Sequence, residues 1–386
     1  MYKRSLVFRA ACVGMLLFGV TLITLGAVVP GLKEKFQLND VNTGTLFSIL
    51  PLGILSGSLV FGPVCDRYGY KLLLCLSCLC IFAGFEGIAY APSLGVLKIS
   101  IYLFGLGGGA VNGATNAVVA DISTTGKGSS LSLLGVFFGI GALGMPVLLG
   151  LMQQVVSSAT IVSFVGLLTA GAGVFFALIR FPLPKHAQGF PVAKGISLLK
   201  DEILLLISFF LFCQSSFEAI INNWITTYLM GRLSVSSSNA LYALSLFVAG
   251  MTVMRLLLGS ILSGISVRQI LQISFTGVLL GCLLLWWSPS FAVAVTGLVF
   301  LGAGLASGFP VMLGLAGSRY ADLSATAFSI ALVIALAGNM VVNYGMGIIT
   351  YRYGIQHLTT VAFAELVVMS ILGTVILTKK HINSSI

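Results

Sequence analysis

The chain has 386 residues, of which 58% are hydrophobic and only 8% are charged, and its net charge is +10 at pH 7. A soluble globular protein has about a quarter of its residues charged, so this composition excludes the class of soluble enzymes. The basic residues lie in short connectors between long apolar runs, as membrane-flanking charges do, and no nucleic-acid partner is expected.

Apolar runs recur along the whole sequence. A run of about 20 apolar residues is long enough to cross the hydrocarbon of a membrane as a helix. We therefore predict an all-α membrane protein with twelve transmembrane helices, arranged as two pseudo-symmetric six-helix bundles. The predicted spans are 9–30, 41–62, 72–91, 95–120, 129–153, 159–180, 203–230, 238–262, 269–287, 291–317, 324–350 and 357–378.

One polar interruption is much longer than the others. It covers Arg180–Asp201 and separates six apolar runs from six. We expect an N-terminal bundle over residues 1–181, a cytoplasmic linker over 182–202 and a C-terminal bundle over 203–386. Most Lys and Arg residues lie on the side that also holds both termini, so the positive-inside rule predicts that both termini are cytoplasmic.

A charged, glycine-flanked segment between spans two and three returns at half the chain length. Gly62–Lys71 reads GPVCDRYGYK, and Gly259–Arg268, which begins 197 residues later, reads GSILSGISVR. Gly141 in span five and Gly338 in span eleven are separated by the same 197 residues. A repeated membrane hairpin is typical of two-lobed transporters whose central site alternates between the two sides of the membrane.

The segment Gly62-x-x-x-Asp66-Arg67-x-Gly69-x-Lys71 matches the signature of the major facilitator superfamily, and the chain resembles this family over nearly its whole length. Further stretches resemble its fucose permease branch, which includes glucose-transporter-like members. They are Asn112-x-x-x-Asn116, Phe137-Phe-Gly-x-Gly141-Ala-x-x-x-Pro146, Phe217-Glu218, Trp224-x-x-x-Tyr228, Arg255-x-x-x-Gly259 and Phe309-Pro310. The resemblance implies rocker-switch transport around a cavity lined by spans one, four, seven and ten.

The resemblance also implies gating residues. Asp66 and Arg67 would tie helices together on the cytoplasmic side, whereas the second copy of the segment has Ser263 and Gly264 instead and would lack this latch. Asp121, at the cytoplasmic end of span four, is assigned to the same group. Arg255 in span eight is assigned there too, although pairing with an acid, contact with a substrate carboxylate and extension towards lipid headgroups all remain open.

Polar residues inside the spans form the candidate binding site. Gln214, Glu218 and Asn222 recur at spacings of four, which places them along one face of span seven. Amide groups both donate and accept hydrogen bonds and suit neutral, hydroxyl-rich ligands, although they also join neighbouring helices. Glu218 is the only acid on the predicted cavity face, so coupling to an ion is assigned to it. The predicted substrate-binding residues are Asn112, Asn116, Gln214, Glu218, Asn222, Asn223, Trp224, Phe309, Asn339 and Asn343.

These residues favour a secondary transporter for a monosaccharide or related polyol that works by symport. Proton-coupled sugar members of the branch carry an acid where this chain has Asn112, so H⁺ and Na⁺ both stay open as the coupling ion. The alternatives are an efflux antiporter for amphipathic compounds, suggested by Gly141-x-x-Gly144-x-Pro146-x-x-x-Gly150, and a receptor of the same fold. We expect a monomer in a bacterial cytoplasmic (inner) membrane.

Motifs for catalysis and for cofactors are absent from the sequence. It has no phosphate-binding GKS or GKT segment, and its three His residues are scattered over connectors. We therefore expect neither an enzyme, nor a bound cofactor, nor a metal site.

Overall fold

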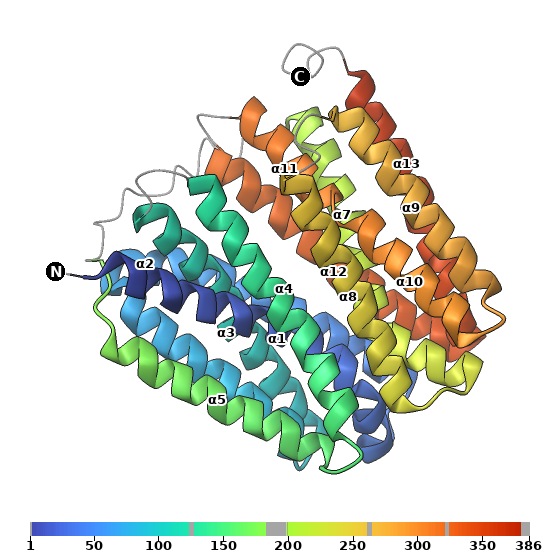
Figure 1. Cartoon of the computed structure of the whole chain (residues 1–386), viewed down its shortest axis with the longest axis horizontal. Coiled ribbons are helices and arrows are strands. Elements are labelled where there is room, and N and C mark those ends of the chain that lie inside the picture. The colour runs from blue at the N-terminus through green and yellow to red at the C-terminus, as the bar shows by residue number, and fades with distance from the viewer. Residues whose placement is uncertain are drawn as a thin grey trace. The chain divides into compact units, whose positions relative to one another are not determined.

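The computed structural model describes residues 2–122, 127–182, 198, 200–260, 265–320 and 324–379, and helices dominate these ranges (Figure 1). Twelve helical segments within them are long and apolar enough to cross a membrane, which confirms the predicted all-α membrane fold. The helices are α1 (Arg4–Phe36), α2 (Asp40–Tyr90), α3 (Leu94–Ile122), α4 (Lys127–Met152), α5 (Ser158–Leu178), α7 (Glu202–Leu233), α8 (Ser237–Ser260), α9 (Val267–Trp287), α10 (Phe291–Leu305), α11 (Gly308–Arg319), α12 (Ser324–Tyr353), the short 3₁₀ helix η2 (Ile355–His357) and α13 (Leu358–Thr378).

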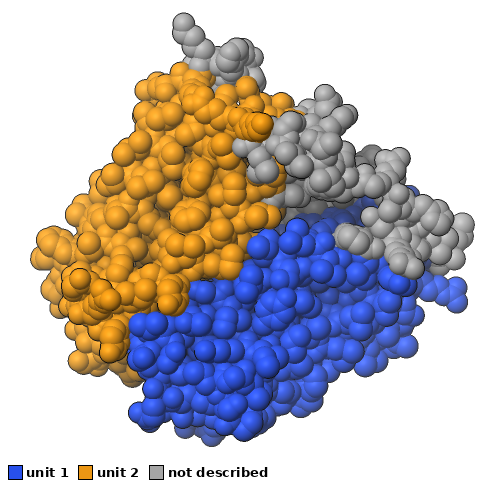
Figure 2. Space-filling view, turned by 180° about the vertical axis from the view of Figure 1, so that it is seen from behind, with its two compact units in different colours: residues 1–188, 237–245 blue, residues 189–236, 246–386 orange. Residues whose placement is uncertain are grey.

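The chain forms two compact units (Figure 2). Unit 1 comprises residues 1–188 together with 237–245, and unit 2 comprises residues 189–236 together with 246–386. The first residues of α8 thus group with unit 1, a division that no composition change in the sequence marks. The boundaries predicted for the two bundles and the linker stay predictions.

Polar residues between the apolar runs define where several helices begin. The side chains of Asn39, Ser157 and Ser290 each accept a hydrogen bond from a backbone N–H in the first turn of the helix that follows. Ser266 does the same for α9. The side chain of Gln269 in turn accepts a hydrogen bond from the Ser266 N–H, which completes a capping box. These bonds satisfy N–H groups that have no partner inside the helix.

Spans two and three are two helices that meet at a kink and share the label α2, with the spans at Asp40–Phe61 and Tyr68–Tyr90. The backbone of α2 stays helical from Asp40 to Tyr90 except at Gly69, whose φ of 83° is in the left-handed region. Glycine reaches this region without the steric strain that a side chain brings. The hinge expected over Gly62–Lys71 is therefore a bend at one glycine. The side chains of Asp66 and Arg67, the predicted gate, lie outside the described residues.

Span ten, in contrast, is divided where the sequence predicts one helix over 291–317. Helix α10 ends at Leu305 and α11 begins at Gly308. In a continuous helix, the N–H of residue 310 would donate a hydrogen bond to the Ala306 carbonyl oxygen. Pro310 has no N–H, so this bond is missing. The break thus leaves backbone carbonyl oxygens for other partners inside unit 2.

Glycine crossings between helices repeat in the two units. A Cβ atom placed on Gly105 of α3 would lie 2.3 Å from the Leu50 carbonyl oxygen of α2, and one on Gly302 of α10 would lie 2.0 Å from that of Phe247 in α8. Both members of the second pair lie 197 residues after those of the first. A further two crossings show the same spacing, Gly53 with Tyr102 and Gly250 with Val299. Only glycine permits such close backbone approach.

The glycines that the sequence pairs, Gly141 and Gly338, also make equivalent contacts. A Cβ atom on Gly141 of α4 would lie 2.1 Å from the Leu16 carbonyl oxygen of α1. One on Gly338 of α12 would lie 2.5 Å from the Phe212 carbonyl oxygen of α7. The repeat read from the sequence therefore corresponds to the same helix crossings in each unit.

Candidate functional site

An ion pair next to the break in span ten forms the centre of the candidate site in unit 2. Arg255 Nη2 of α8 lies 3.6 Å from Glu218 Oε2 of α7, and the two side chains are 31% and 14% exposed. Arg255 Nε also donates, over a long 3.5 Å, to the Ala306 carbonyl oxygen at the break. Of the three roles left open for Arg255, the structure therefore shows pairing with an acid, and one guanidinium connects three elements.

Gln214, one turn before Glu218, is committed to the same break. Its side chain is 1% exposed, and its Nε2 donates to the Leu305 carbonyl oxygen at 2.8 Å. Its Oε1 lies where it would be 2.3 Å from a Cβ atom on Gly308. Two freed carbonyl groups of span ten thus receive side-chain donors from α7 and α8. Phe309, in the first turn of α11, is half-buried beside this break.

Asn222 is the amide on this face of α7 that retains an unused polar atom. Its side chain is 5% exposed, and its Oδ1 is buried without a hydrogen-bond partner among the described residues. An amide oxygen left in this way costs about 1–3 kcal/mol relative to a satisfied one. A solute hydroxyl or a water molecule bound at this atom would remove that cost.

The remaining amides of unit 2 hydrogen-bond to one another. Asn343 of α12 is fully buried, and its Oδ1 accepts from Asn223 Nδ2 at 3.0 Å and from Trp224 Nε1 at 3.2 Å. Its Nδ2 donates to Asn339 Oδ1 at 2.9 Å. These contacts tie α7 to α12, which is the helix-joining alternative to substrate binding. A role in binding stays a prediction for all four residues.

In unit 1 the predicted pair on α3 is also in contact. Asn116 Nδ2 donates to Asn112 Oδ1 at 3.0 Å and to the Asn112 carbonyl oxygen at 2.9 Å. Both side chains are half-buried, unlike Asn343. Beside them, Thr115 lies against α1, where its hydroxyl is 3.7 Å from the sulfur of Met15. The structure thus brings the predicted residues together in pairs within each unit.

Among the gating residues, Asp121 can be placed in unit 1. Its Oδ2 accepts a hydrogen bond of 2.7 Å from the Tyr70 hydroxyl, which follows the bend at Gly69. The contact ties the end of α3 to the second half of α2. Sequence reasoning missed Tyr70, although its position inside the charged segment Gly62–Lys71 was a usable signal.

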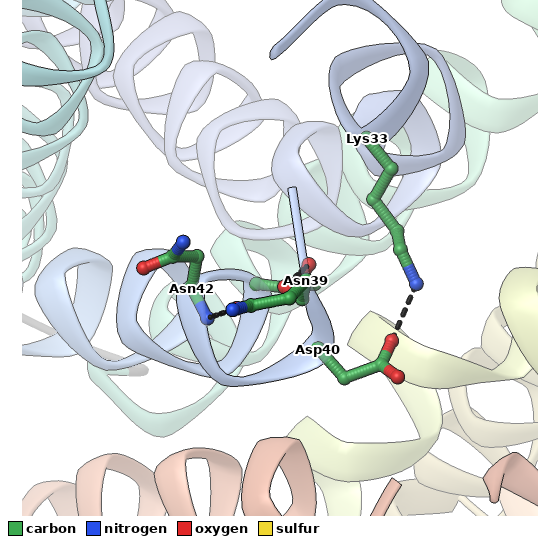
Figure 3. Close-up of polar contacts among 5 residues, drawn as sticks. Lys33, Asn39, Asp40 and Asn42 are labelled. Atoms are coloured by element: carbon green, nitrogen blue, oxygen red, sulfur yellow. Dashed lines mark hydrogen bonds and ion pairs between the residues drawn. The ribbon is translucent and has the colours of Figure 1, made fainter. Parts of the chain in front are cut away.

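The C-terminal end of α1 carries an ion pair that the sequence pattern does not predict (Figure 3). Lys33 Nζ lies 2.5 Å from Asp40 Oδ1 across the turn to α2. In the same turn, Asn39 Oδ1 accepts from the Asn42 N–H at 2.8 Å, and Gln37 adopts a left-handed φ of 49°. These contacts hold the connection between spans one and two in a defined conformation.

Asp201, just before α7, and Tyr320, just after α11, are in contact and both have shifted pKa values. Partial burial acts to raise the pKa of Asp201, but hydrogen bonds from the Tyr320 hydroxyl and from the N–H groups of Leu204 and Ile203 outweigh it and lower that pKa. Burial, followed by the bond to Asp201, raises the pKa of Tyr320 to about 12. Asp201 therefore caps α7 as a carboxylate and connects it to the end of α11.

Two further acids that lie within the helices, Glu86 and Glu365, have close partners. Both oxygens of Glu86 in unit 1 accept from the Ser163 hydroxyl, at 2.9 and 3.1 Å. Glu365 of α13 lies against Ser216 of α7 and is 8% exposed. No group of three or more His, Cys, Asp and Glu side chains that could hold a metal ion occurs in the described part of the chain.

Comparisons with known proteins agree with this architecture. The family description "Major Facilitator Superfamily" matches residues 11–342. The uncharacterized transporter y4wD of Sinorhizobium fredii is 24% identical over 79% of this chain and 80% of its own, and a D-xylose transporter of Levilactobacillus brevis is 28% identical over 33% of this chain and 28% of its own. The crystal structure of a point mutant of the nucleoside transporter NupG superimposes with a TM-score of 0.81 at 14% identity, over 97% of this chain and 98% of the other.

Proposed function

The chain belongs to the Major Facilitator Superfamily, and from this premise we propose that it moves a monosaccharide or related polyol across the membrane by cation symport. It is an integral membrane transporter and not an enzyme. We place it in a bacterial cytoplasmic membrane as a monomer with both termini inside. The repeat supports an alternating-access mechanism, in which a central site opens to one side of the membrane and then to the other.

The observation that carries symport is the Glu218–Arg255 pair at bilayer depth. Ionisable groups inside a membrane are costly, so a pair retained there is a functional-site hypothesis by default. A cation bound at Glu218 would compete with Arg255 for the carboxylate, and Arg255 would then rely on the Ala306 carbonyl oxygen that it already contacts. Binding of H⁺ or Na⁺ thus has a direct route to the break in span ten.

The solute class rests on amides rather than on charges. Asn222 Oδ1 has no hydrogen-bond partner in the part of the chain that the structure describes, and the half-buried Asn112–Asn116 pair adds further amide groups in unit 1. Neutral donors and acceptors match hydroxyl-rich solutes, which need many hydrogen bonds and no counter-charge. The partial sequence likeness to a D-xylose transporter supports the same class. We propose membership of the fucose permease branch on the motifs alone.

The efflux alternative rests on the glycines of α4. Gly141 is occupied by its crossing with α1, and a Cβ atom on Gly144 would meet nothing within 4 Å. Helix packing accounts for Gly141 without an antiport function. The efflux reading therefore serves as the competing outcome of the experiment below.

A thermal-shift screen of the purified protein tests this proposal. Monosaccharides, sugar acids and amphipathic drugs are compared with and without sodium and at two pH values. A ligand at 100 times its Kd stabilises the protein by about 2.7 kcal/mol, which is a readily measured shift. We expect stabilisation by monosaccharides or polyols, strengthened by the coupling cation. Stabilisation by amphipathic drugs alone would support efflux and contradict the proposal.

A further inference from the structure

Glu365 is a membrane acid that the Glu218–Arg255 site does not use. It lies on α13, 8% exposed, and its Oε1 is in hydrogen-bond contact with the Ser216 hydroxyl of α7. Its Oε2 is buried without a hydrogen-bond partner among the described residues. The ion pairs found in the described part of the chain do not include it. Burial and an unused oxygen occur together on one carboxyl group.

Counting hydrogens at Ser216 indicates where a proton is needed. Ser216 Oγ lies 2.8 Å from the Phe212 carbonyl oxygen and 3.0 Å from that of Cys213, in addition to its contact with Glu365. A serine hydroxyl has one hydrogen, so it can serve one of these three acceptors fully. If Glu365 were ionised, its charge would receive at most that one bond.

A protonated Glu365 removes the conflict. A hydrogen on Oε1 is donated to Ser216 Oγ, and the serine hydrogen is donated to the Phe212 carbonyl, as is common for serine in a helix. Oε2 is then a neutral carbonyl oxygen, whose burial costs far less than that of an isolated carboxylate. Every short oxygen–oxygen contact around Ser216 except the weaker one to Cys213 then has its own hydrogen.

The elements that pack against α13 are α7, α9, α12 and η2. On α7, the titratable group beside Glu365 is the Cys213 thiol. The charged and titratable side chains on the other three elements are Arg268 and Cys282 on α9, Tyr344, Tyr351, Arg352 and Tyr353 on α12, and His357 in η2. His357 is eight residues from Glu365, about 12 Å along the helix axis. None of these side chains forms an ion pair with Glu365 among the described contacts.

We propose that Glu365 is a proton-binding site, separate from Glu218, that holds its proton while α7 and α13 are packed together. Ser216 lies between Gln214 and Glu218 in the sequence of α7, so any movement of α7 away from α13 breaks the Glu365–Ser216 contact. Water would then reach the carboxyl group and the proton would leave. This site does not depend on which solute is carried or on which ion Glu218 binds.

Infrared spectroscopy of the purified protein tests the proton directly, because a protonated carboxylic acid has a C=O stretching band that a carboxylate lacks. We expect the wild type to show this band at neutral pH and Glu365→Gln to lose the part of its intensity that comes from Glu365, whether or not Glu218 contributes a second part. Glu86→Gln is the matched control, since both Glu86 oxygens accept from Ser163, and it should keep the full band. A wild type without the band, or a Glu365→Gln variant whose band is as intense as that of the wild type, would overturn the proposal.

A second variant keeps the test valid if Glu365→Gln does not fold. Ser216→Ala leaves the acid in place but removes its hydrogen-bond partner, so the C=O band should shift in frequency. An unshifted band would place the proton elsewhere. Thermal unfolding adds an independent readout, because the folded protein holds a proton that the unfolded chain releases at ordinary carboxyl pH. The wild type should therefore lose stability as the pH rises from the ordinary carboxyl range to the pH at which folded Glu365 ionises, while Glu365→Gln should lose less over the same range. Equal losses over this range would also count against the site.

Discussion

Among single residues, Arg255 determines the charge balance of the candidate site. It lies well inside predicted span eight, and the structure gives it a carboxylate on α7 and a carbonyl oxygen at the break in span ten. Because 31% of the Arg255 side chain is exposed, water partly screens its attraction to Glu218. The pair therefore contributes less to the stability of the fold than the same attraction would in a fully buried pair. The pair is therefore better suited to exchange partners than to stabilise the fold.

Replacing Glu218 with Gln should abolish concentrative uptake while leaving the protein folded. The amide keeps the size of the side chain but can neither bind a cation strongly nor neutralise Arg255. We expect a stability loss below the roughly 3–5 kcal/mol seen when a fully buried pair loses one partner. The measurement compares accumulation under an ion gradient with exchange at equal concentrations in proteoliposomes. Glu202→Gln, at the exposed start of α7, is the control, and full accumulation by the Glu218 variant would remove it from coupling.

Asp201 gives a prediction for acid pH. Its pKa is lowered in the folded state, so its contribution to stability is present above the usual carboxyl range and is lost as pH falls through the lowered value. Asp201→Ala should cost about 1 kcal/mol at neutral pH through loss of the helix cap. The difference in Tm between wild type and variant should narrow on acidification. A difference that stays constant with pH would show that the carboxylate charge is not involved.

At the scale of helices, the decisive contacts are glycines that face a backbone carbonyl of a neighbouring helix. They let α2 approach α3 and let α8 approach α10 at a distance that no side chain permits. The break between α10 and α11 belongs to this scale too, since it leaves the carbonyl groups of Leu305 and Ala306 that Gln214 and Arg255 contact. One short stretch of span ten thus contains both the glycine that packs against α8 and the carbonyl groups that accept hydrogen bonds from α7 and α8.

Gly141 and Gly144 lie one turn apart on α4, and alanine substitutions at these two positions distinguish an effect on helix packing from an effect on helix propensity. Gly141→Ala would bring a Cβ atom to 2.1 Å from the Leu16 carbonyl oxygen, so α1 and α4 must move apart. We expect a loss of about 1–3 kcal/mol, as for other overpacked sites. Gly144→Ala meets nothing within 4 Å and should be neutral or stabilising by up to about 1 kcal/mol. Thermal unfolding of both variants is the measurement, and equal losses would contradict the crossing.

At the scale of the whole molecule, the same set of helix crossings occurs twice, 197 residues apart. Internal repeats of this kind are a common feature of secondary transporters. The units differ in chemistry nevertheless. The Glu218–Arg255 pair and the Glu365–Ser216 contact belong to unit 2, whereas unit 1 has the Asn112–Asn116 pair.

The orientation of the chain can be tested with single cysteines at exposed positions. Gln356→Cys in η2 should react from outside with a membrane-impermeant maleimide in intact cells, and Lys200→Cys before α7 should react only after the cells are opened. Both side chains are exposed, so accessibility depends on the side of the membrane alone. The reverse labelling pattern would overturn the cytoplasmic placement of the termini.

The sequence by itself determined the number of spans, their approximate limits and the half-length repeat. These features depend on hydrophobicity and on glycine spacing, which are properties of short stretches of chain and survive in any packing. Gly141 and Gly338 are an example. Their matching positions in the two halves of the sequence predict two close helix crossings, although the sequence does not identify the partner helices.

Only the tertiary structure decided which polar side chains meet. The sequence left three roles open for Arg255 and paired Glu365 with no other residue, yet Glu365 and Ser216 contact each other across 149 residues. Such contacts depend on how each helix is rotated about its axis and on which neighbour it faces, and the sequence pattern of one helix contains neither. Span ten, which the sequence predicts as one helix, is divided between Leu305 and Gly308, and the donors to its carbonyl groups come from α7 and α8, so helix packing determines them.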